Sequence, residues 1–527
     1  MGISTLGYTL TFLAFIIYAV SLIRSYHAEK RFQQFARDNG AEPAKPVEYK
    51  LPWALDGMYR VLRAVSRGED FFDDIIGKRL EEMNTWTYES AGLFGSVLVS
   101  TAEPRNVQAV FATKFNDYSI GKLRKKQFGV LLGKGIFTVD GPAWSHARAL
   151  FRPLFARDNI NDLVETERAS NILIDVIPSG HDGWTSTVDL LPLFYRFTLD
   201  TATSFIFGES VNSQLAEASS ETNNKKRREF AKFSDAFSKA QELISLRVKL
   251  QSLYFVADGL KSRAVTETVR QFTRQTIQAT LARRSNVKEK QTGHGTYSIV
   301  EELAKSTSDQ EEIQDNVLSL MAAGRDTTSA LLSWMFYLLA THPNVFRKLR
   351  NVIIEDFGDS PSSGKKIGFA ELKSCRYLQY VINETLRLYP TVPANMRTAI
   401  RDTILPVGGG PNGDRPVAIR KGQVVGVFIY NMQRRPDIWG EDADEFRPER
   451  FRDRKHDWSF VPFSGGPRVC LGQQYAIIEA SYLTVRLLQT FDNITWVGAQ
   501  GRPVKGMGIT LFPQHGTKVR LHYADKK

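Results

Sequence analysis

A glycine-rich segment that carries one of the two cysteines constrains this chain more than any other feature of its sequence. Cys470 lies within residues 463–472, which read FSGGPRVCLG, and the apolar periodicity of Gln474–Phe491 predicts a helix directly afterwards. The cysteine is therefore expected at the amino end of a helix, where free amides and the helix dipole favour the thiolate anion. A thiolate is also a strong axial ligand for haem iron. A buried structural cysteine beside a turn is the alternative.

Composition excludes several other classes of protein. The 527 residues are 42% hydrophobic and 24% charged, as in a folded globular protein. Cys375 and Cys470 are far apart, so a disulfide scaffold and a cysteine-cluster zinc or iron–sulfur site are excluded. The net charge is +12, but no basic stripe with interleaved aromatic residues appears, and we expect no nucleic-acid partner. No Gly/Ser-rich or Pro-rich linker interrupts the middle of the chain, which favours one catalytic domain over residues 53–527.

The amino terminus predicts a membrane anchor. Residues 1–23 carry no charged side chain, and a stretch of this length spans a bilayer. Basic residues follow from Arg24 on, so the positive-inside rule predicts a single-pass protein with a cytoplasmic catalytic domain. Residues 24–52 are expected to form a stiff, proline-containing connector. A signal peptide cleaved near Ser21 is the alternative, although no basic region precedes the apolar stretch.

The remaining chain is predicted to be mainly α with a minor β part. Helices are expected over Glu312–Ala340, Glu371–Tyr389 and Gln474–Phe491, because apolar residues recur there at helical spacing. Strands are expected over Gly95–Ser100, Val417–Ile419, Gln423–Tyr430, Gly508–Phe512 and Thr517–His522. The segment Pro406–Pro416, with three successive glycines, is expected to be a turn or loop insertion.

Several motifs in one order give a resemblance to a known family. The defined positions of the cysteine segment are Phe463, Gly466, Arg468, Cys470 and Gly472, and upstream stand Ala323–Thr328 (AGRDTT), Glu384–Arg387 (ETLR), Phe446–Phe451 (FRPERF) and Trp144–Arg148 (WSHAR). Together they resemble the haem-thiolate monooxygenases of the cytochrome P-450 superfamily. The resemblance implies that family's fold preceded by one transmembrane helix, and haem b ligated by Cys470. It also implies electrons from NADPH through NADPH–cytochrome P-450 reductase, and cytochrome b5 as a further partner.

The predicted long helix carries Asp326 and Thr327 on an otherwise apolar face, beside Ala323. The Thr327 hydroxyl can donate to the carbonyl four residues earlier, that of Ala323. The resemblance implies that this stretch lies over the iron, that Thr327 steadies the iron–oxygen intermediate, and that Asp326 helps to relay protons. A local salt bridge between Asp326 and a neighbour on the helix is the alternative.

Glu384 and Arg387 are three positions apart and so share a helix face. The resemblance implies that they form, with Arg450, a buried ionic network under the haem with a structural role.

The resemblance also implies the residues that hold the haem. Propionate contacts are expected from Trp144, Arg148, Arg397 and Arg468. Gly466 and Gly472 would let the backbone approach the macrocycle, and Phe463 could shield the sulfur. The basic cluster formed by Arg452, Arg454, Lys455 and His456 precedes the cysteine loop. It is expected to face an acidic reductase surface, with a solvated loop as the alternative.

Four local stretches resemble the fungal n-alkane and fatty-acid hydroxylases of the superfamily: Gly133–Gly141, Trp144–Ala156, Leu405–Gly413 and Arg468–Ala476. This resemblance implies hydroxylation of a long aliphatic chain, commonly at its terminal carbon. The apolar anchor and its basic flank predict a location in the endoplasmic reticulum membrane. The expected pocket residues are Ala323, Val392, Met396 and Met507, which suit any hydrophobic small molecule. A polycyclic or secondary-metabolite substrate is therefore one alternative. A non-catalytic haem sensor is another, but such a protein has no need of the Asp326–Thr327 pair.

Overall fold

The computed structural model describes residues 2–67, 69–92, 97–218, 225–287, 298–360 and 363–524. The chain forms two compact units. The first contains residues 1–119 and 396–428, and the second contains residues 120–395 and 429–527.

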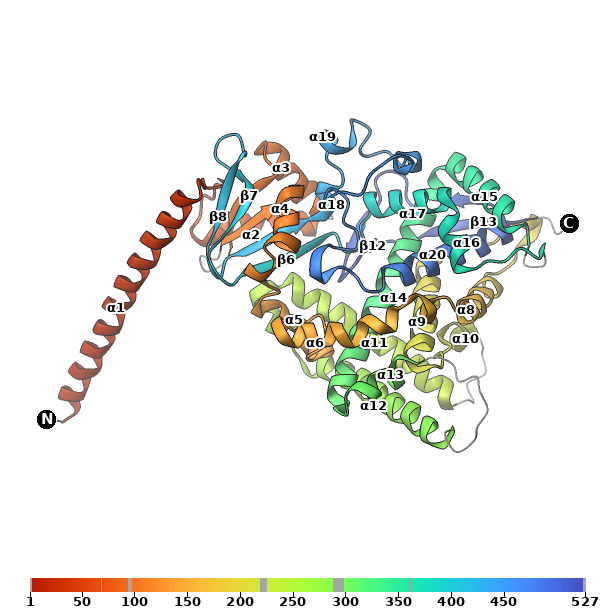
Figure 1. The fold of residues 1–527 in the computed structure, drawn as a ribbon, viewed down its shortest axis with the longest axis horizontal. Helices are drawn as coiled ribbons and strands as arrows, with labels where there is room; N and C mark the ends of the chain where they lie inside the picture. Colours follow the sequence, from red (N-terminus) through yellow and green to blue (C-terminus); the bar gives the residue numbers. More distant parts are fainter. Residues whose placement is uncertain are drawn as a thin grey trace. The chain divides into compact units, whose positions relative to one another are not determined.

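A six-stranded sheet of order β1-β2-β3-β9-β6-β4 organises the first unit. Leu98 pairs with Val424 in a parallel ladder between β3 and β9, so segments far apart in sequence lie side by side (Figure 1). The β-branched residues Val99, Val425 and Val427 of this ladder are buried, as expected for strands at the centre of a sheet. The elements of this unit are α1 (Gly2–Asp38), β1 (Lys45–Pro46), α2 (Leu55–Ser66), α3 (Lys78–Glu82), β2 (Thr87–Ala91), β3 (Val97–Thr101), α4 (Pro104–Gln108), β4 (Tyr118–Ser119), β6 (Ala394–Ala399), β7 (Thr403–Gly409), β8 (Arg415–Ile419) and β9 (Val424–Phe428).

The predicted loop Pro406–Pro416 is wrong over part of its length. The antiparallel pair β7 and β8 reaches inward to Gly409 and Arg415, so the connection itself is short. Gly408 and Gly410 have φ values of +110° and +74°, which side chains rarely adopt. A Cβ at Gly408 would also lie 2.5 Å from the Thr87 side chain. The glycines that suggested a loop therefore allow a strand to approach a neighbour. Two residues of the predicted strand Gly95–Ser100 lie outside the described residues, and β3 begins at Val97.

Helix α1 extends beyond the predicted anchor. It continues without a break from Gly2 to Asp38, past residue 23 and into the predicted connector (Figure 1). The stretch Leu10–Asp38 is long and apolar enough to cross a membrane. Its carboxy-terminal part contacts β8 and the residue after it, since Arg420 donates to Glu29 at 2.8 Å and lies 4.2 Å from the Phe32 ring centroid. The large apolar side chains between Leu10 and Ile23 are exposed, as a membrane-spanning helix requires.

The second unit is mostly helical, which confirms the predicted fold class. Its helices are α5 (Lys122–Leu132), α6 (Gly141–Phe151), α7 (Arg157–Ile160), α8 (Val164–Asp175), α9 (Leu190–Phe207), α10 (Ser213–Ala218), α11 (Lys225–Lys249), α12 (Leu260–Val287), α13 (Ile299–Ser306), α14 (Gln310–Thr341), α15 (Pro343–Phe357), α16 (Phe369–Ser374), α17 (Arg376–Leu388), α18 (Ile429–Met432), α19 (Pro436–Trp439) and α20 (Gln473–Thr490). Its strands are β5 (Val188–Asp189), β10 (Phe491–Trp496), β11 (Lys505–Met507), β12 (Leu511–Pro513) and β13 (Lys518–Tyr523).

Helix α14 is the central element of this unit and matches the predicted helix Glu312–Ala340. The Asp309 carboxylate caps it by accepting from the amides of Glu311 and Glu312. The helix ends at Thr341, just before Pro343.

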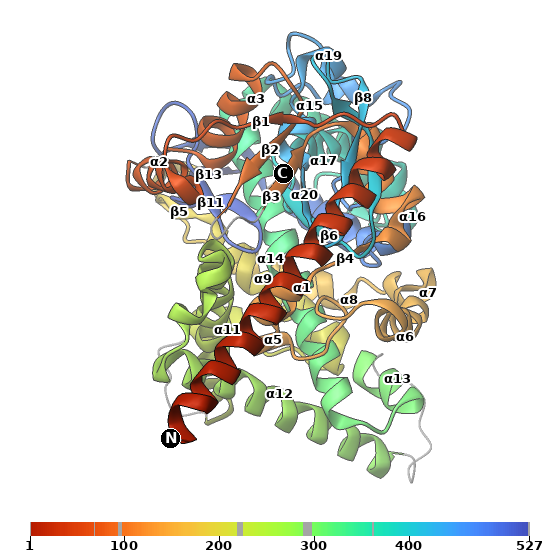
Figure 2. The ribbon, with the colours of Figure 1, turned by 90° about the vertical axis from the view of Figure 1, so that its left-hand side faces the viewer.

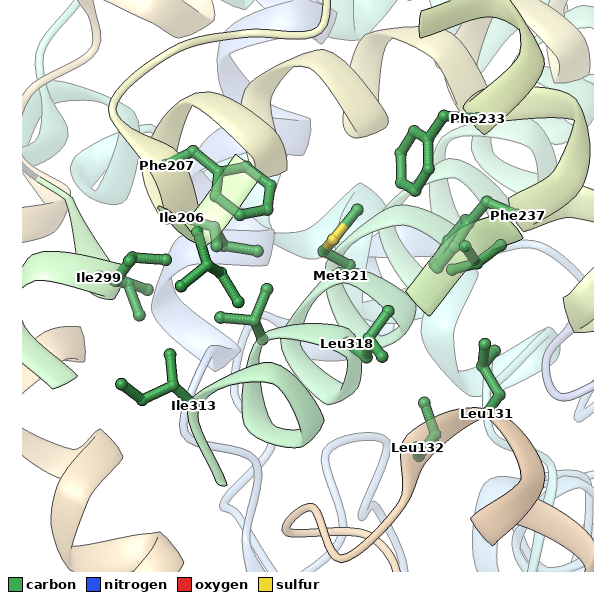
Figure 3. Packing of buried hydrophobic residues seen from close by; sticks show 14 of the residues in the cluster. Leu131, Leu132, Ile206, Phe207, Phe233, Phe237, Ile299, Ile313, Leu318 and Met321 are labelled. Carbon is green, nitrogen blue, oxygen red and sulfur yellow. The ribbon is translucent and has the colours of Figure 1, made fainter. Parts of the chain in front are cut away.

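Apolar side chains from α5, α9, α11, α13 and α14 meet in one core around α14 (Figure 3). Leu318 and Met321 of α14 belong to it, together with Ile206 of α9 and Phe237 of α11. Helix α12 runs beside α11 (Figure 2), where the rings of Phe233 and Phe272 stack with centroids 4.1 Å apart.

Two further predictions need correction. The predicted helix Glu371–Tyr389 is divided into α16 and α17, because Cys375 has a non-helical ψ of 85° between them. The predicted strand Gly508–Phe512 is a turn followed by β12, since the Gly508 amide donates to the Thr510 carbonyl at 3.0 Å and closes a β11–β12 hairpin. The predicted helix Gln474–Phe491 is α20 within one residue.

Candidate active site

The loop before α20 is closed by its own backbone. The Cys470 amide donates to the Phe463 carbonyl at 3.0 Å, and the Val469 amide donates to the Gly466 carbonyl at 3.1 Å. Gly466 has a φ of +64°, so the turn requires a residue that accepts the left-handed region. We expected a glycine at position 466 because the backbone would approach the macrocycle closely. The positive φ of Gly466 is already a sufficient reason for a glycine at this position. Gly472 is the N-cap residue of α20 and has a negative φ. The loop presents Cys470 at the amino end of α20, as predicted.

The Cys470 side chain combines exposure with a dense protein surrounding. It is exposed to solvent, yet burial raises the pKa of its thiol above the usual value. The sulfur is therefore accessible, although protein atoms surround it closely enough to disfavour its charged form. The Gly472 amide and the Arg148 guanidinium both act to lower this pKa. The amide at the helix end lowers the pKa of the Cys470 thiol, as predicted, but desolvation raises that pKa by more. The net effect of the protein alone therefore disfavours the thiolate.

Three residues predicted to hold the haem propionates lie together beside this loop. Arg468 lies 4.5 Å from the Trp144 ring centroid and donates to Asp140 at 2.9 Å. Arg148, one turn after Trp144 on α6, donates to the Val469 carbonyl at 3.0 Å. Two guanidinium groups and an indole thus gather next to Cys470.

Sequence reasoning missed two charged residues of this cluster. Asp140, the N-cap residue of α6, also pairs with Lys125 at 3.0 Å. Arg124 of α5 is half-buried, and desolvation lowers its pKa. Its Nε is buried and finds no hydrogen-bond partner among the described residues. Arg124 belongs to a short charged stretch, residues 122–126, and Asp140 is a single acidic residue before Gly141, so neither position gives a signal of depth in the sequence. The positive charges of Arg124 and Arg148 both act on Arg468, whose carboxylate partner is Asp140, and burial lowers the pKa of Arg468 to about 10.

The charges of these residues fit a haem group. A cluster with excess positive charge and an orphaned buried guanidinium nitrogen accommodates a dianion such as two propionates. A thiol that is costly to ionise alone becomes a stable thiolate when a metal ion replaces its proton.

Arg397 and Met396 belong to the first unit. Arg397 is buried, donates to the Met396 carbonyl at 2.9 Å, and lies 5.2 Å from the Phe111 ring centroid. Met396 is 39% exposed. Their expected places at the propionates and in the substrate pocket stay predictions.

The predicted hydrogen bond of Thr327 is present. Its hydroxyl donates to the Ala323 carbonyl at 2.7 Å. Ala323, Gly324 and Thr327 are only partly buried, although α14 is buried on both sides of this stretch. The helix therefore has an open face at the position that the motif predicted.

Asp326 also makes the contact that the alternative predicted. Its carboxyl is buried, and its Oδ1 lies 3.3 Å from a guanidinium nitrogen of Arg325. Burial raises the pKa of Asp326, while Arg325 acts to lower it. The contact with Arg325 is compatible with a role in proton relay, because the Asp326 carboxyl can still take up and release a proton beside this cation.

Glu479 of α20 is a second buried carboxyl that sequence reasoning missed. It accepts a hydrogen bond from the Thr201 hydroxyl of α9, and Thr328 of α14 is a further hydrogen-bond partner. Burial raises the pKa of Glu479 to about 8. Its position nine residues after Cys470 on an amphipathic helix is the only sequence signal that could have identified it.

This raised pKa predicts a pH dependence of stability. The unfolded chain ionises Glu479 near pH 4.3, whereas the folded protein keeps the proton until about pH 8. The folded state therefore binds more protons in this window, and the contribution of Glu479 to the free energy of unfolding falls as pH rises through it. Glu479→Gln should remove this fall, so that the variant gains on the wild type between pH 5 and pH 8. Chemical denaturation at both pH values measures this.

Glu267→Gln, on the exposed side of α12, is the matched control and should follow the wild type at both pH values. Wild type and Glu479→Gln losing stability in parallel would show that Glu479 ionises normally in the folded protein.

The predicted ionic network is present and fully buried. Arg387 donates to Glu384 through Nε at 2.7 Å and through Nη2 at 2.8 Å. Arg450 approaches the same carboxylate at 3.4 Å. Arg387 also donates to the carbonyls of Gln433, Ala443 and Glu445. Every charge in the group has a partner, as a structural role requires.

The predicted basic cluster is only partly a solvated surface. Arg452, Lys455 and His456 are exposed, whereas the Arg454 guanidinium lies 3.5 Å from the Trp439 ring centroid and donates to Ser459. Three exposed cationic or titratable side chains therefore remain for a partner.

The segment around Val392 is held on both sides. The Leu511 amide of β12 donates to the Thr391 carbonyl at 2.9 Å, and the Tyr430 amide donates to the Pro393 carbonyl at 3.0 Å. Val392 between them is half-buried. Met507, also half-buried, accepts a hydrogen bond from Ser245 of α11 through its carbonyl at 3.2 Å.

Comparisons with known proteins identify the family. The family model described as Cytochrome P450 matches residues 93–518. The chain is 41% identical over 516 residues to "Cytochrome P450 monooxygenase g430" of Fusarium sp, covering 96% of this chain and 89% of that protein. It is 44% identical over 439 residues to "Cytochrome P450 52A1" of Candida tropicalis, covering 82% of this chain and 79% of that protein. "Cytochrome P450 52A13" of Debaryomyces hansenii is 39% identical, with 91% of both chains covered.

A solved structure supports the fold. The chain matches "Crystal structure of cytochrome P450DA heme domain" with a TM-score of 0.65 at 20% identity, covering 83% of this chain and 89% of that chain. The predicted fold and the predicted resemblance to fungal members of the superfamily are confirmed. The chain belongs to the cytochrome P450 family and is a haem-thiolate monooxygenase that receives electrons from NADPH through a reductase.

Proposed function

We propose that this monooxygenase hydroxylates fatty acids or n-alkanes at or near the free end of the chain. The main observation that supports this proposal is that Trp144, Arg148 and Arg468 lie next to Cys470, where they could hold a haem. The likeness to the yeast relatives supports the aliphatic substrate, because local motifs of this chain resemble fungal aliphatic-chain hydroxylases.

In this proposal Cys470 supplies the thiolate ligand, and Arg148, Arg468, Trp144 and Arg397 bind the propionates. When bound, the haem supplies the activation of O2 that inserts one oxygen atom into a C–H bond. The reaction balances as RH plus O2, two electrons and two protons giving ROH and water, with both electrons supplied by NADPH.

The protein must deliver those two protons to a site that otherwise excludes water. Thr327 donates its hydroxyl proton to the Ala323 carbonyl, so its oxygen lone pairs are turned toward the open face of α14. Asp326, the preceding residue, carries a buried carboxyl that can take up and release a proton. We assign Asp326 as the relay and Thr327 as the acceptor that would hold a water at this face.

Terminal hydroxylation also needs restricted access, because the primary C–H bond is stronger than those of neighbouring carbons. The backbone bonds on both sides of Val392 make this segment a rigid candidate for the constriction. Ala323, Met396 and Met507 are the other residues proposed to contact the substrate.

The anchor and partner assignments complete the proposal. Helix α1 would hold the protein in the endoplasmic reticulum membrane with its catalytic domain cytoplasmic. Arg452, Lys455 and His456 would meet the acidic surface of the reductase, and cytochrome b5 is a further electron donor. Protease added to intact microsomes should digest the catalytic domain, and its protection would contradict this orientation.

The experiment that tests the substrate class is turnover with NADPH and reductase on a panel of fatty acids, n-alkanes, a sterol and a polyketide. Terminally hydroxylated aliphatic products are expected. Val392→Ala should move hydroxylation inward along the chain, while Val345→Ala on α15 should leave the product distribution unchanged. Turnover of the sterol or polyketide alone would overturn the aliphatic assignment and leave the family assignment intact.

A further inference from the structure

The residue beside the proposed proton relay is itself unusual. Arg325 is buried within α14, although a long charged side chain is rarely buried without partners. Its guanidinium lies 4.7 Å from the Tyr195 ring centroid on α9 and 5.6 Å from the Phe237 ring centroid on α11. Phe237 belongs to the core shown in Figure 3, so its ring is fixed by packing. The cation is therefore held between two aromatic faces.

A hydrogen bond fixes Arg325 further. Its Nη2 donates to the Ser238 hydroxyl on α11 at 2.7 Å, and that hydroxyl donates to the Ser234 carbonyl at 2.9 Å. On α14 itself, the Arg325 carbonyl accepts from the Thr198 hydroxyl of α9 at 2.9 Å. Both its side chain and its backbone are thus tied to neighbouring helices.

The contact between Arg325 and Asp326 is less constrained than these bonds. The two charges are 3.3 Å apart, yet Asp326 Oδ1 and Arg325 Nε make no hydrogen bond among the described residues. The pair thus has charge contact without the directional bonds that would lock the carboxylate in place. Such a carboxyl lies beside a positive charge but stays free to turn and to exchange a proton.

We propose that Arg325 is the positioning residue for Asp326, and that it makes proton delivery depend on where α11 lies. This inference rests on the proton-relay role proposed above. Helix α11 supplies Phe237 and Ser238 to Arg325, and its Ser245 bonds to Met507 in the proposed substrate pocket. A substrate that displaces α11 therefore shifts the cation that lowers the pKa of Asp326.

The groups around Asp326 define the expected titration. Arg325 faces it from α14, and the Tyr195 hydroxyl faces it from α9, with its pKa raised by burial and by the charge of Asp326. Glu242 of α11 acts on the same tyrosine. Arg325 is thus the cation acting on a carboxyl whose pKa burial already raises. Removing an adjacent arginine typically raises a carboxyl pKa by about 1–3 units.

The test uses the holoenzyme with Arg325→Met, Arg325→Lys and Ser238→Ala. Infrared difference spectra between acid and alkaline pH report the protonated carboxyl, with Asp326→Asn identifying its band. Arg325→Met should move the midpoint of this band to higher pH by about 1–3 units. It should also shift the pH profile of product formed per NADPH in the same direction and release several-fold more peroxide. Arg325→Lys should restore most of both properties, and Ser238→Ala should shift both by a smaller amount.

Controls separate this inference from the proposed function. Lys239→Met removes an exposed cation from α11, and it should leave both readouts unchanged. Thermal unfolding and the carbon monoxide spectrum show which variants fold with haem. An unchanged infrared midpoint in Arg325→Met would overturn the positioning role, and if that variant does not fold, an unchanged midpoint in Ser238→Ala would overturn it instead. Unchanged coupling in Asp326→Asn and Thr327→Ala would overturn the relay, while the infrared titration still decides what Arg325 does.

Discussion

Cys470→Ala is expected to abolish the red-shifted Soret band of the reduced, carbon monoxide-bound protein, together with all turnover. The band reports thiolate ligation, and the loop of residues 463–472 places this sulfur at the amino end of α20. No other side chain of that loop can supply a thiolate. Absorption spectra of the purified variant, with circular dichroism as a check on folding, measure the effect.

The second cysteine is the natural control for this experiment. Cys375 is buried at the junction of α16 and α17, and burial raises the pKa of its thiol to about 12, so it stays protonated. Cys375→Ala should keep both the band and the activity. The reverse result, with the band lost in Cys375→Ala and kept in Cys470→Ala, would show that the ligand has been assigned to the wrong cysteine.

Arg387→Ala should destabilise the protein by about 3–5 kcal/mol, because it leaves the Glu384 carboxylate buried with much of its neutralising charge removed. A loss of this size is a large share of the stability of a typical domain. Three backbone carbonyls would lose their donor as well. We expect a sharply lower yield of haem-containing protein, and a lower denaturation midpoint for the fraction that folds.

An exposed pair provides the comparison for that variant. Lys348 pairs with Glu449 at the surface, and Lys348→Ala should cost no more than about 1 kcal/mol. Arg387→Lys retains the charge but not the forked geometry and should fall between the two. Equal denaturation midpoints for Arg387→Ala and Lys348→Ala would mean that the buried network contributes no more than a surface ion pair.

Sequence reasoning succeeded where the determinants are local. The bond from Thr327 to the Ala323 carbonyl follows from a spacing of four on one helix, and the Glu384–Arg387 contact follows from a spacing of three. The turn at Gly466 and the start of α20 are set by residues within a few positions of each other. These features could be predicted because neighbouring residues alone determine them.

The parts that could not be predicted depend on distant segments. Arg468 meets Asp140 across 328 positions, and Glu479 meets Thr201 across 278 positions. No local pattern indicates that the Arg124 Nε is buried or that Arg325 lies between two aromatic rings. The division of the helix at Cys375 and the strand through Gly409 likewise depend on packing partners. The properties of these side chains depend on how far they are buried and on which distant residues they contact, and residue type alone does not determine either.

The pairing of β3 with β9 also imposes an order on biosynthesis. Leu98 of β3 is hydrogen-bonded to a strand that starts at Val424, so its partner leaves the ribosome 326 residues later (424 − 98). At about 5–20 residues per second, that interval lasts on the order of 20–60 seconds. Throughout it, β3 offers an unpaired edge that could associate with another chain. Strand β3 is therefore translated long before it reaches its final partner, and this nascent strand is where chaperone protection during synthesis would matter most.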